Sequence, residues 1–235
     1  MFQTTHLTNT DKLIVLIKGA PEAEKDFSAW YLNRHAPATA ACPAVRLYTA
    51  NIITRDFDEE IEASFGKIPD SPWSVIALDE VYAPGWDDVK SLYQGVPLAG
   101  VYSVTEYVIR QLITDRPLGQ KTPEIKRMTL MTKPEERTHD EAMRYWLEKH
   151  APLSLLHSSG MARYVQNHIT GTIIPGVSSL NSFAETHYWN MNALKYGQFS
   201  QPDSQKILVE DCKNFRSSKG NFATALTMYE YIMKA

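Results

Sequence analysis

The sequence contains few cysteines and no long hydrophobic run. Only Cys42 and Cys212 are cysteines among its 235 residues, and they do not form a Cys-x-x-Cys pair, so neither a disulfide framework nor a thiolate metal site is expected. The aliphatic run LIVLI at 13–17 is far too short to cross a bilayer, and residues 1–12 lack the charged and apolar regions of a secretory signal. We therefore expect a cytoplasmic protein that does not bind membranes.

Neither sign of charge is in strong excess. The 24 basic and 27 acidic residues give a formal net charge of -3, and no basic block is present. Electrostatics therefore gives no reason to expect nucleic acid or an anionic lipid surface as a partner. The hydrophobic fraction of 43% is that of an ordinary globular protein, and the length suits one large domain or two of ordinary size.

Several catalytic motifs are also missing. The sequence has no Gly-x-Ser-x-Gly elbow, no histidine close to either cysteine, and no glycine-rich loop in front of a helix. These absences argue against a nucleophilic enzyme and against phosphate chemistry.

One short pattern occurs twice. The stretch YLNRHAP ends at Pro37 and YWLEKHAP ends at Pro152, which places His35 and His150 115 positions apart, about half the chain. RLYTAN at 46–51 similarly matches RYVQNH at 163–168, and TEYVIR at 105–110 matches YEYIMK at 229–234. Three matches in the same order predict an internal duplication.

The order of predicted elements is βαββαβ in each half. Aliphatic and alternating runs predict strands, and apolar residues at helical spacing predict helices. Thr138 and Glu141 have the spacing of a capping box, and Pro37 should end the preceding helix at Ala36. The predicted strands are 12–19, 44–54, 72–83, 100–112, 125–133, 161–170, 182–190 and 224–234. The predicted helices are 26–36, 87–95, 138–152 and 202–215.

This order predicts an α+β protein of two tandem ferredoxin-like domains, residues 1–116 and 125–235. The segment ITDRPLGQKTPE at 113–124 is rich in turn formers and is the predicted linker. A ferredoxin-like antiparallel sheet has helices on one face and leaves the other face for a partner. We expect the two sheets of this chain to pack face to face.

The His-Ala-Pro helix, the RYVQNH and AETHYW strands and the EDCKNF helix resemble the EthD-like family of the dimeric α+β barrel superfamily. The resemblance covers nearly the whole chain and is sharper from Ile125 onward. It implies a pseudo-dimeric barrel, monomeric or paired again as a homodimer. It also implies a first half with degenerate chemistry, because Asn51 stands opposite His168 in the sequence match and VIALDEVY replaces FAETHYWN.

The second half holds most of the histidines, which indicates acid–base chemistry there. His150 lies four residues after Trp146 and seven after Met143, so it shares the apolar helix face and should point at the sheet or at a pocket above it. The alternative is a histidine that only hydrogen-bonds the carbonyls of the last helical turn. The five histidines of this half are His139, His150, His157, His168 and His187.

Strand alternation places the other candidates. Tyr164, Gln166 and His168 should share one face of their strand, as should Phe183, Glu185, His187 and Trp189 on the next. We expect the polar members of both sets to converge below His150, the alternative being an exposed sheet edge. The predicted catalytic residues are His150, His168, His187 and Tyr164, and the predicted substrate-binding residues are Arg163, Glu185, Trp146, Trp189, His35 and Arg46.

A metal site is the weaker alternative for these residues. His168, Glu185 and His187 have the composition of a facial triad, but their spacing does not fix a common site, and we expect neither a metal nor another cofactor. The resemblance implies isomerases, cyclases and anthrone-type oxygenases that use no cofactor. We therefore predict a histidine-dependent isomerase for a small conjugated carboxylate or lactone derived from an aromatic compound. The alternatives are a polyketide dehydratase or cyclase, a cofactor-free anthrone-type oxygenase, and a protein that binds such a molecule without converting it.

Overall fold

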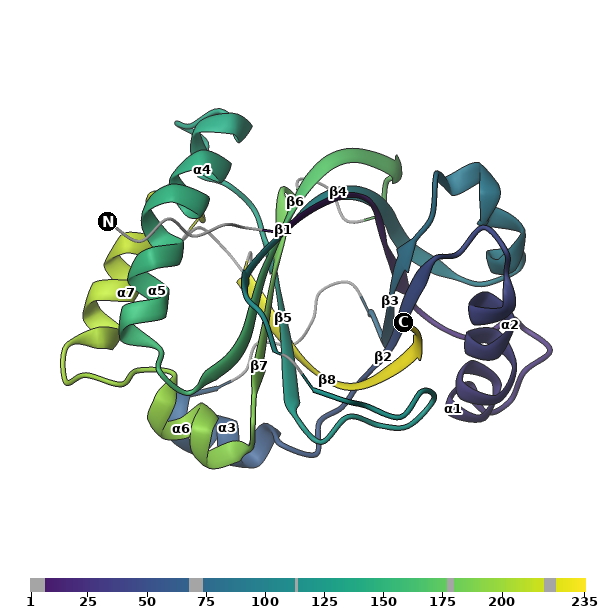
Figure 1. Cartoon of the computed structure of the whole chain (residues 1–235), viewed down its shortest axis with the longest axis horizontal. Coiled ribbons are helices and arrows are strands. Elements are labelled where there is room, and N and C mark those ends of the chain that lie inside the picture. Colours follow the sequence, from purple (N-terminus) through teal and green to yellow (C-terminus); the bar gives the residue numbers. More distant parts are fainter. Residues whose placement is uncertain (1–6, 68–73, 113, 177–179, 218–222) are drawn as a thin grey trace.

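The computed structural model describes residues 7–67, 74–112, 114–176, 180–217 and 223–235. Within these ranges, eight antiparallel strands form a closed barrel in the order β1-β3-β2-β8-β5-β7-β6-β4 (Figure 1). The strands are β1 (Leu7–Ile17), β2 (Leu47–Ile53), β3 (Ala77–Tyr82), β4 (Leu98–Arg110), β5 (Ile125–Met131), β6 (Met161–Ile174), β7 (Ser182–Tyr188) and β8 (Ala223–Lys234).

Each half of the chain contributes four neighbouring strands. The first half has the order β4-β1-β3-β2 and the second half β8-β5-β7-β6, and the two halves meet where β2 pairs with β8 and β4 with β6. One face of every strand therefore points into the barrel and the other toward the helices outside it. The predicted α+β class is confirmed.

The helices lie outside the barrel on two opposite sides (Figure 1). Those of the second half, α4, α5 and α7, cover β5, β6 and β7, whereas α1 and α2 cover the first half. The helices at 58–65 and 191–197 were not predicted from the sequence. The helix predicted at 87–95 is instead a pair of 3₁₀ turns at 86–88 and 90–93. The α-helices are α1 (Phe27–Trp30), α2 (Ala36–Ala41), α3 (Asp58–Phe65), α4 (His139–Tyr145), α5 (Ala151–His157), α6 (Met191–Gly197) and α7 (Ser204–Cys212).

Both His-Ala-Pro helices continue through their proline, so the predicted end at Ala36 is wrong. A π-helical turn at 31–35 joins α1 to α2, and a second one at 146–150 joins α4 to α5. In these turns the N–H of Ala36 donates to the carbonyl of Tyr31, five residues back, and Ala151 does the same to Trp146. The widened turn moves the carbonyl that the proline ring would otherwise strike, and π-turns often lie at functional sites.

The capping box at the start of α4 is present as predicted. The Thr138 hydroxyl accepts from the Glu141 N–H at 3.2 Å, and the Glu141 carboxylate accepts from the Thr138 N–H at 2.9 Å.

The predicted linker packs on the barrel, since Thr122 donates its N–H to the carbonyl of Glu230 and its own side chain is buried. Residue 113 lies outside the described residues.

The strand register shifts the sequence match between the halves by one residue. Asn51 on β2 faces Glu230 of β8, and Asn167 on β6 faces Glu106 of β4. Asn51 thus corresponds to Asn167, and the expected correspondence with His168 is wrong.

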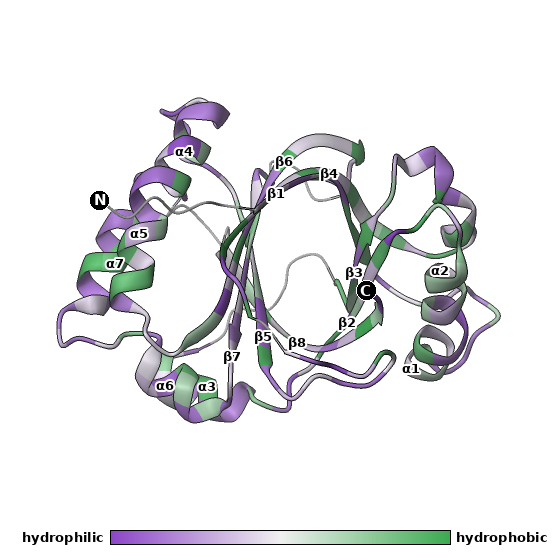
Figure 2. Cartoon of the chain, viewed as in Figure 1, coloured by the Kyte–Doolittle hydropathy of each residue, from purple (hydrophilic) through white to green (hydrophobic). Residues whose placement is uncertain are grey.

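The interior of the barrel has an apolar layer and a charged layer, and the strands alternate between hydrophobic and hydrophilic positions (Figure 2).

No α-helix in the described ranges is long and apolar enough to cross a membrane.

Candidate functional site

A cavity lies between the helices of the second half and the outer face of β5, β6 and β7. Its volume is about 240 Å³, slightly below the range of about 300–1,000 Å³ that is usual for ligand pockets. Most of its wall is apolar, and a few polar groups converge on it. The lining residues used below are Thr129, Trp146, His150, Ser154, Tyr164 and Arg216.

His150 is held at both ring nitrogens. Its Nδ1 lies 2.7 Å from Oδ2 of Asp211, and its Nε2 lies 2.8 Å from Oγ of Ser154. The hydrogen bond from His150 keeps the pKa of Asp211 below its usual value against the opposing effect of burial, and a 2.7 Å bond from the Tyr145 hydroxyl adds to it. A charged carboxylate at Nδ1 selects the tautomer in which Nε2 accepts a proton.

Tyr164 lies beside this histidine on the sheet. Its oxygen accepts hydrogen bonds from Nε1 of Trp146 at 2.9 Å and from Nε2 of Gln166 at 3.0 Å, and it also contacts the Ser154 hydroxyl. Burial raises the pKa of the Tyr164 phenol well above its usual value, so the group is a neutral donor. The sequence prediction correctly brings His150, Tyr164 and Trp146 together.

Arg216 supplies positive charge to the cavity. It follows α7, and its guanidinium has no ion pair or hydrogen bond among the residues that the structure describes. The other cations discussed below are paired with carboxylates. An unpaired guanidinium in a pocket is suited to a carboxylate, which it can bind through two parallel hydrogen bonds.

The first half of the chain also contributes to this region. Helix α3 lies beside α6, away from the other helices of its own half (Figure 1). Phe65 of α3 packs edge-on against Phe199, a residue of the cavity wall, and Glu60 pairs with Lys195 at 2.7 Å. Helix α3 of the first half therefore supports one wall of the cavity, although all lining residues belong to the second half.

His168 lies behind the cavity wall rather than in it. Its ring stacks on Trp146 with 5.1 Å between centroids, and its Nε2 lies 3.0 Å from Oε1 of Gln166. Burial, with the nearby charge of His139, lowers the pKa of His168 to about 3. His168 is therefore neutral near pH 7, and its contact with Trp146 suits a supporting position.

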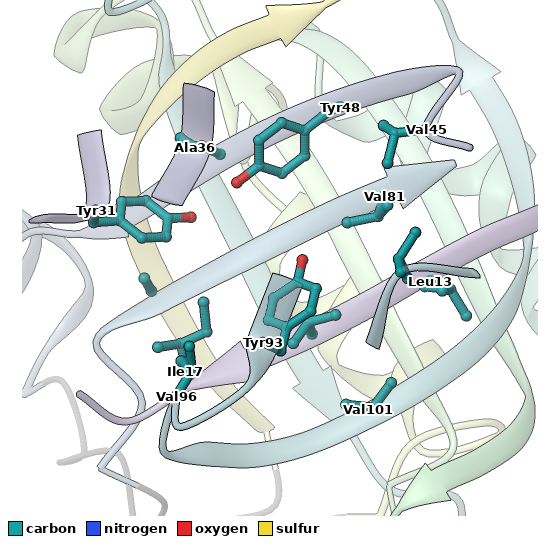
Figure 3. Close-up of a cluster of buried hydrophobic side chains, with 14 of the residues drawn as sticks. Leu13, Ile17, Tyr31, Ala36, Val45, Tyr48, Val81, Tyr93, Val96 and Val101 are labelled. Carbon is teal, nitrogen blue, oxygen red and sulfur yellow. The ribbon is translucent and has the colours of Figure 1, made fainter. Parts of the chain in front are cut away.

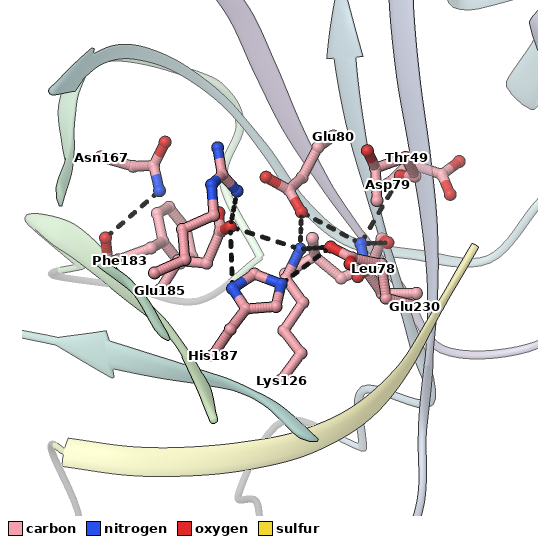
Figure 4. Close-up of polar contacts among 12 residues, drawn as sticks. Thr49, Leu78, Asp79, Glu80, Lys126, Asn167, Phe183, Glu185, His187 and Glu230 are labelled. Carbon is pink, nitrogen blue, oxygen red and sulfur yellow. Dashed lines mark hydrogen bonds and ion pairs between the residues drawn. The ribbon is translucent and has the colours of Figure 1, made fainter. Parts of the chain in front are cut away.

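The predicted convergence of Glu185 and His187 with Tyr164 is wrong. Tyr164 pairs with Thr186 across β6 and β7, and paired residues share a face, so the neighbours of Thr186 point to the opposite face. Glu185 and His187 lie inside the barrel (Figure 4). The Arg163 guanidinium pairs with Glu185 there. The sheet separates them from His150.

The charged layer of the barrel is an extensive ion-pair network. Lys126 lies 2.8 Å from Glu230 and 3.7 Å from Glu185, and Nε2 of His187 lies 3.1 Å from Glu230. Ligand atoms of Glu185, His187 and Glu230 lie within 4.8 Å of one another, as a metal site would need. The carboxylates of Glu185 and Glu230 are already paired with arginine or lysine, so these residues fit an ion-pair network better than a metal site. His168 belongs to no such set because it lies on the outer face of the sheet.

The corresponding region of the first half is filled by a buried carboxylate. Asp79 accepts from the Tyr48 hydroxyl at 2.9 Å, from Tyr93 at 2.8 Å and from Nε2 of His35 at 2.9 Å, and it also bonds Tyr31. Figure 3 shows the three tyrosine hydroxyls pointing toward the same part of β3. Burial, followed by the charge of Asp79, raises the pKa of all three phenols. His35 is thus part of a closed polar cluster.

Two further predicted substrate-binding residues lie on the surface. The Arg46 side chain is 56% exposed and pairs with Asp11, whereas the side chain of Arg163 is 20% exposed. Trp189 is half exposed because β7 ends at Tyr188, which breaks the strand alternation on which the prediction rested. Neither residue contributes to the cavity.

Sequence reasoning missed Ser154, Asp211 and Arg216. Ser154 follows His150 by four residues, and that spacing alone places the two on one helical face. Asp211 and Arg216 come from the EDCKNF helix and its end. That helix contributed to the family resemblance, but its contact with His150 was not predicted because helix packing across 61 residues is not visible in a local pattern.

Comparison with known proteins gives information on the fold. No family model matches the chain, and no curated protein matches its sequence. An anthrone oxidase-like protein superposes with a TM-score of 0.56 and 12% identity over 99% of this chain and 95% of that chain. A candidate monooxygenase of Fusobacterium nucleatum gives 0.53 and 7% over 96% and 94%.

A third structure, an EthD family protein of Bacillus halodurans, is 21% identical over 44% of this chain and 95% of its own, with a TM-score of 0.34. Because the identities of the first two structures are low, their superposition shows a likeness of architecture alone. The eight-stranded barrel and its outer helices have the dimeric α+β barrel fold.

Proposed function

We propose that this protein is an enzyme that moves a proton on a small conjugated carboxylate or lactone, with His150 as the base. The observation that carries the proposal is the Asp211–His150 pair, which faces a cavity lined also by Arg216, whose guanidinium has no ion pair within the described ranges. A base oriented by a carboxylate and an anion-binding group are the two elements that such a reaction needs.

The chemistry follows from these groups. A substrate whose carboxylate binds Arg216 would displace the Ser154 hydroxyl from Nε2 of His150, and Nε2 would take a proton from a carbon next to the conjugated system. Asp211 stabilises the imidazolium and the neutral Tyr164 phenol stabilises the enolate-like intermediate, while Arg216 holds the substrate carboxylate throughout. Return of the proton to another carbon completes an isomerisation and needs no other reactant.

The size and charge of the cavity support a small anionic substrate. About 240 Å³ is sufficient for a single ring or a short dienoate and is small for the ligands of larger pockets. Arg216 favours a carboxylate over a neutral molecule.

The proposal includes two duplicated domains, residues 1–116 and 125–235, with the chemistry in the second. The matching strand orders of the halves and the π-turn before each proline support a duplication. Asp79 and its tyrosines occupy, in the first half, the region that the cavity occupies in the second.

The test is an ultraviolet screen of conjugated dienoates, muconolactones and anthrones with the wild type and with His150→Gln. We expect the wild type to shift the absorbance of an anionic conjugated substrate without consuming oxygen, and His150→Gln to lower kcat by roughly 10²–10⁴-fold. Full activity of a folded His150→Gln variant would remove this histidine from the mechanism. Binding without turnover would indicate a binding protein.

An anthrone-type oxygenase is the second candidate. It is supported by the anthrone oxidase-like neighbour and by the aromatic wall, in which Trp146 and Phe215 stack with 5.6 Å between centroids and 8° between planes. This reaction would use the same base on a larger neutral substrate. Oxygen consumption that depends on an anthrone would favour it over the isomerase.

A further inference from the structure

Ser154 and His150 lie one helical turn apart and are directly hydrogen-bonded. The π-turn at 146–150 ends at His150, and α5 then places Ser154 four residues later on the same face. The distance from Ser154 Oγ to His150 Nε2 is 2.8 Å, which is within reach for proton transfer. Both side chains line the cavity.

Asp211 completes a linear chain of three residues. Its Oδ2 lies 2.7 Å from Nδ1 of His150, and its Oδ1 is held by the Tyr145 hydroxyl at 2.7 Å. The order carboxylate, Nδ1, Nε2, hydroxyl is that of a serine nucleophile activated by a histidine, an arrangement defined by geometry rather than by sequence motif. The absence of a Gly-x-Ser-x-Gly elbow is therefore no obstacle.

Asp211 determines the direction in which the Ser154 hydroxyl hydrogen points. Its carboxylate accepts from Nδ1 of His150, which leaves Nε2 of the neutral ring as an acceptor. The Ser154 hydroxyl, 2.8 Å from Nε2, is then the donor of that hydrogen bond, as a nucleophile requires.

We propose that Ser154, His150 and Asp211 form a nucleophilic triad that hydrolyses small esters or lactones in this cavity. The inference shares its cavity with the proposed function, and it adds covalent catalysis to the proton transfer proposed there. Arg216 and the Thr129 hydroxyl also line the cavity and are the groups available to stabilise the oxyanion.

The reaction balances with water as the only co-reactant. Ser154 Oγ bonds to the carbonyl carbon while its proton moves to Nε2 of His150, and the ester C–O bond breaks as the leaving oxygen takes that proton. Water then attacks the acyl-enzyme, gives one proton to His150, and releases the acid as this proton returns to Ser154 Oγ. The products are one carboxylic acid and one alcohol, or one hydroxy acid from a lactone.

The test is covalent labelling of the full chain with a small alkyl fluorophosphonate, followed by intact-mass measurement and peptide mapping. We expect one adduct, with loss of fluoride, on the peptide that contains Ser154. Ser154→Ala should abolish the adduct, and Asp211→Asn should slow labelling by roughly 10²–10⁴-fold. Ser158→Ala is the matched control, because Ser158 also lines the cavity but donates to the carbonyl of Gln198 and should label like the wild type.

Mapping on the wild type makes the test independent of how the variants fold. No adduct on the folded wild type, or an adduct on another residue, would overturn the triad. Release of p-nitrophenolate from p-nitrophenyl acetate, lost in Ser154→Ala, would support it. A protein that isomerises conjugated acids but resists labelling loses only this inference, and one that labels but does not isomerise loses only the proposed function.

Discussion

Lys12 and Lys126 bind the same carboxylate, that of Glu80, although they lie in different halves of the chain. Lys12 Nζ is 2.6 Å from Oε2 of Glu80, and Lys126 contacts Oε1. Although burial opposes ionisation, the two ammonium groups keep the pKa of Glu80 well below its usual value. The ion pairs inside the barrel therefore join the two halves, and removal of one charged group leaves its partners without a counter-charge.

Lys126→Met should strongly destabilise the protein. Lys126 is fully buried and bonded to Glu230 and Glu80, so the variant leaves buried carboxylates with too few cations. Breaking a buried pair in this way costs about 3–5 kcal/mol, measurable by urea unfolding at neutral pH. The control is Lys195→Met, which breaks the more exposed pair with Glu60 and should cost about 0–1 kcal/mol. Equal losses in both variants would show that water screens the barrel interior.

In the His168→Asn variant, the free energy of unfolding should fall less than in the wild type as the pH is lowered. The pKa of His168 is about 3 in the folded state and about 6.5 in the unfolded chain. Because the folded value is lower, the unfolded chain binds the proton first, and the stabilisation present above about pH 6.5 is lost as the pH falls.

Between pH 7 and pH 5 the wild type should lose about 2 kcal/mol more than His168→Asn. Urea unfolding at both pH values measures this difference, and the other ionisable groups cancel in the comparison. The pH range stays above about 4.5, where the buried glutamates begin to titrate in the unfolded chain. Parallel pH dependences would mean that His168 is protonated in the folded protein.

His35→Gln and His150→Gln should differ in activity. His35 bonds Asp79 in the filled region of the first half, whereas His150 faces the cavity. We expect both variants to melt at lower temperature, and His150→Gln alone to lose turnover of the substrate found in the screen. Loss of turnover in a folded His35→Gln protein would place part of the chemistry in the first half.

Arg216→Met should raise KM for a carboxylate substrate by roughly 10- to 100-fold, since a hydrogen bond to a charged group contributes about 1.5–3 kcal/mol. The effect on kcat should be smaller, because the carboxylate is bound in both the ground state and the transition state. The methyl ester of the same substrate is the control and should bind the two proteins with similar affinity. An unchanged KM for the free acid would show that the anion binds elsewhere.

The sequence predicted those features that depend on local periodicity. Helical spacing placed Trp146 and His150 on the inner face of their helix, and strand alternation assigned Tyr164 correctly to the outer face of β6. Alternation within single strands does not reveal the register between them, so Glu185 and His187 were assigned to the wrong side of the sheet. Asp211 was missed because its contact with His150 depends on how two distant helices pack.

The pairing of β2 with β8 and of β4 with β6 has a consequence for either half in isolation. A fragment of residues 125–235 would carry two unsatisfied strand edges and an exposed sheet face with Lys126, Glu185 and Glu230 on it. Free edges invite pairing with another chain. Two copies of the fragment can supply each other's missing strands, so a half that is separated from this chain should assemble with itself into a true homodimer, the arrangement that the intact chain makes within one polypeptide.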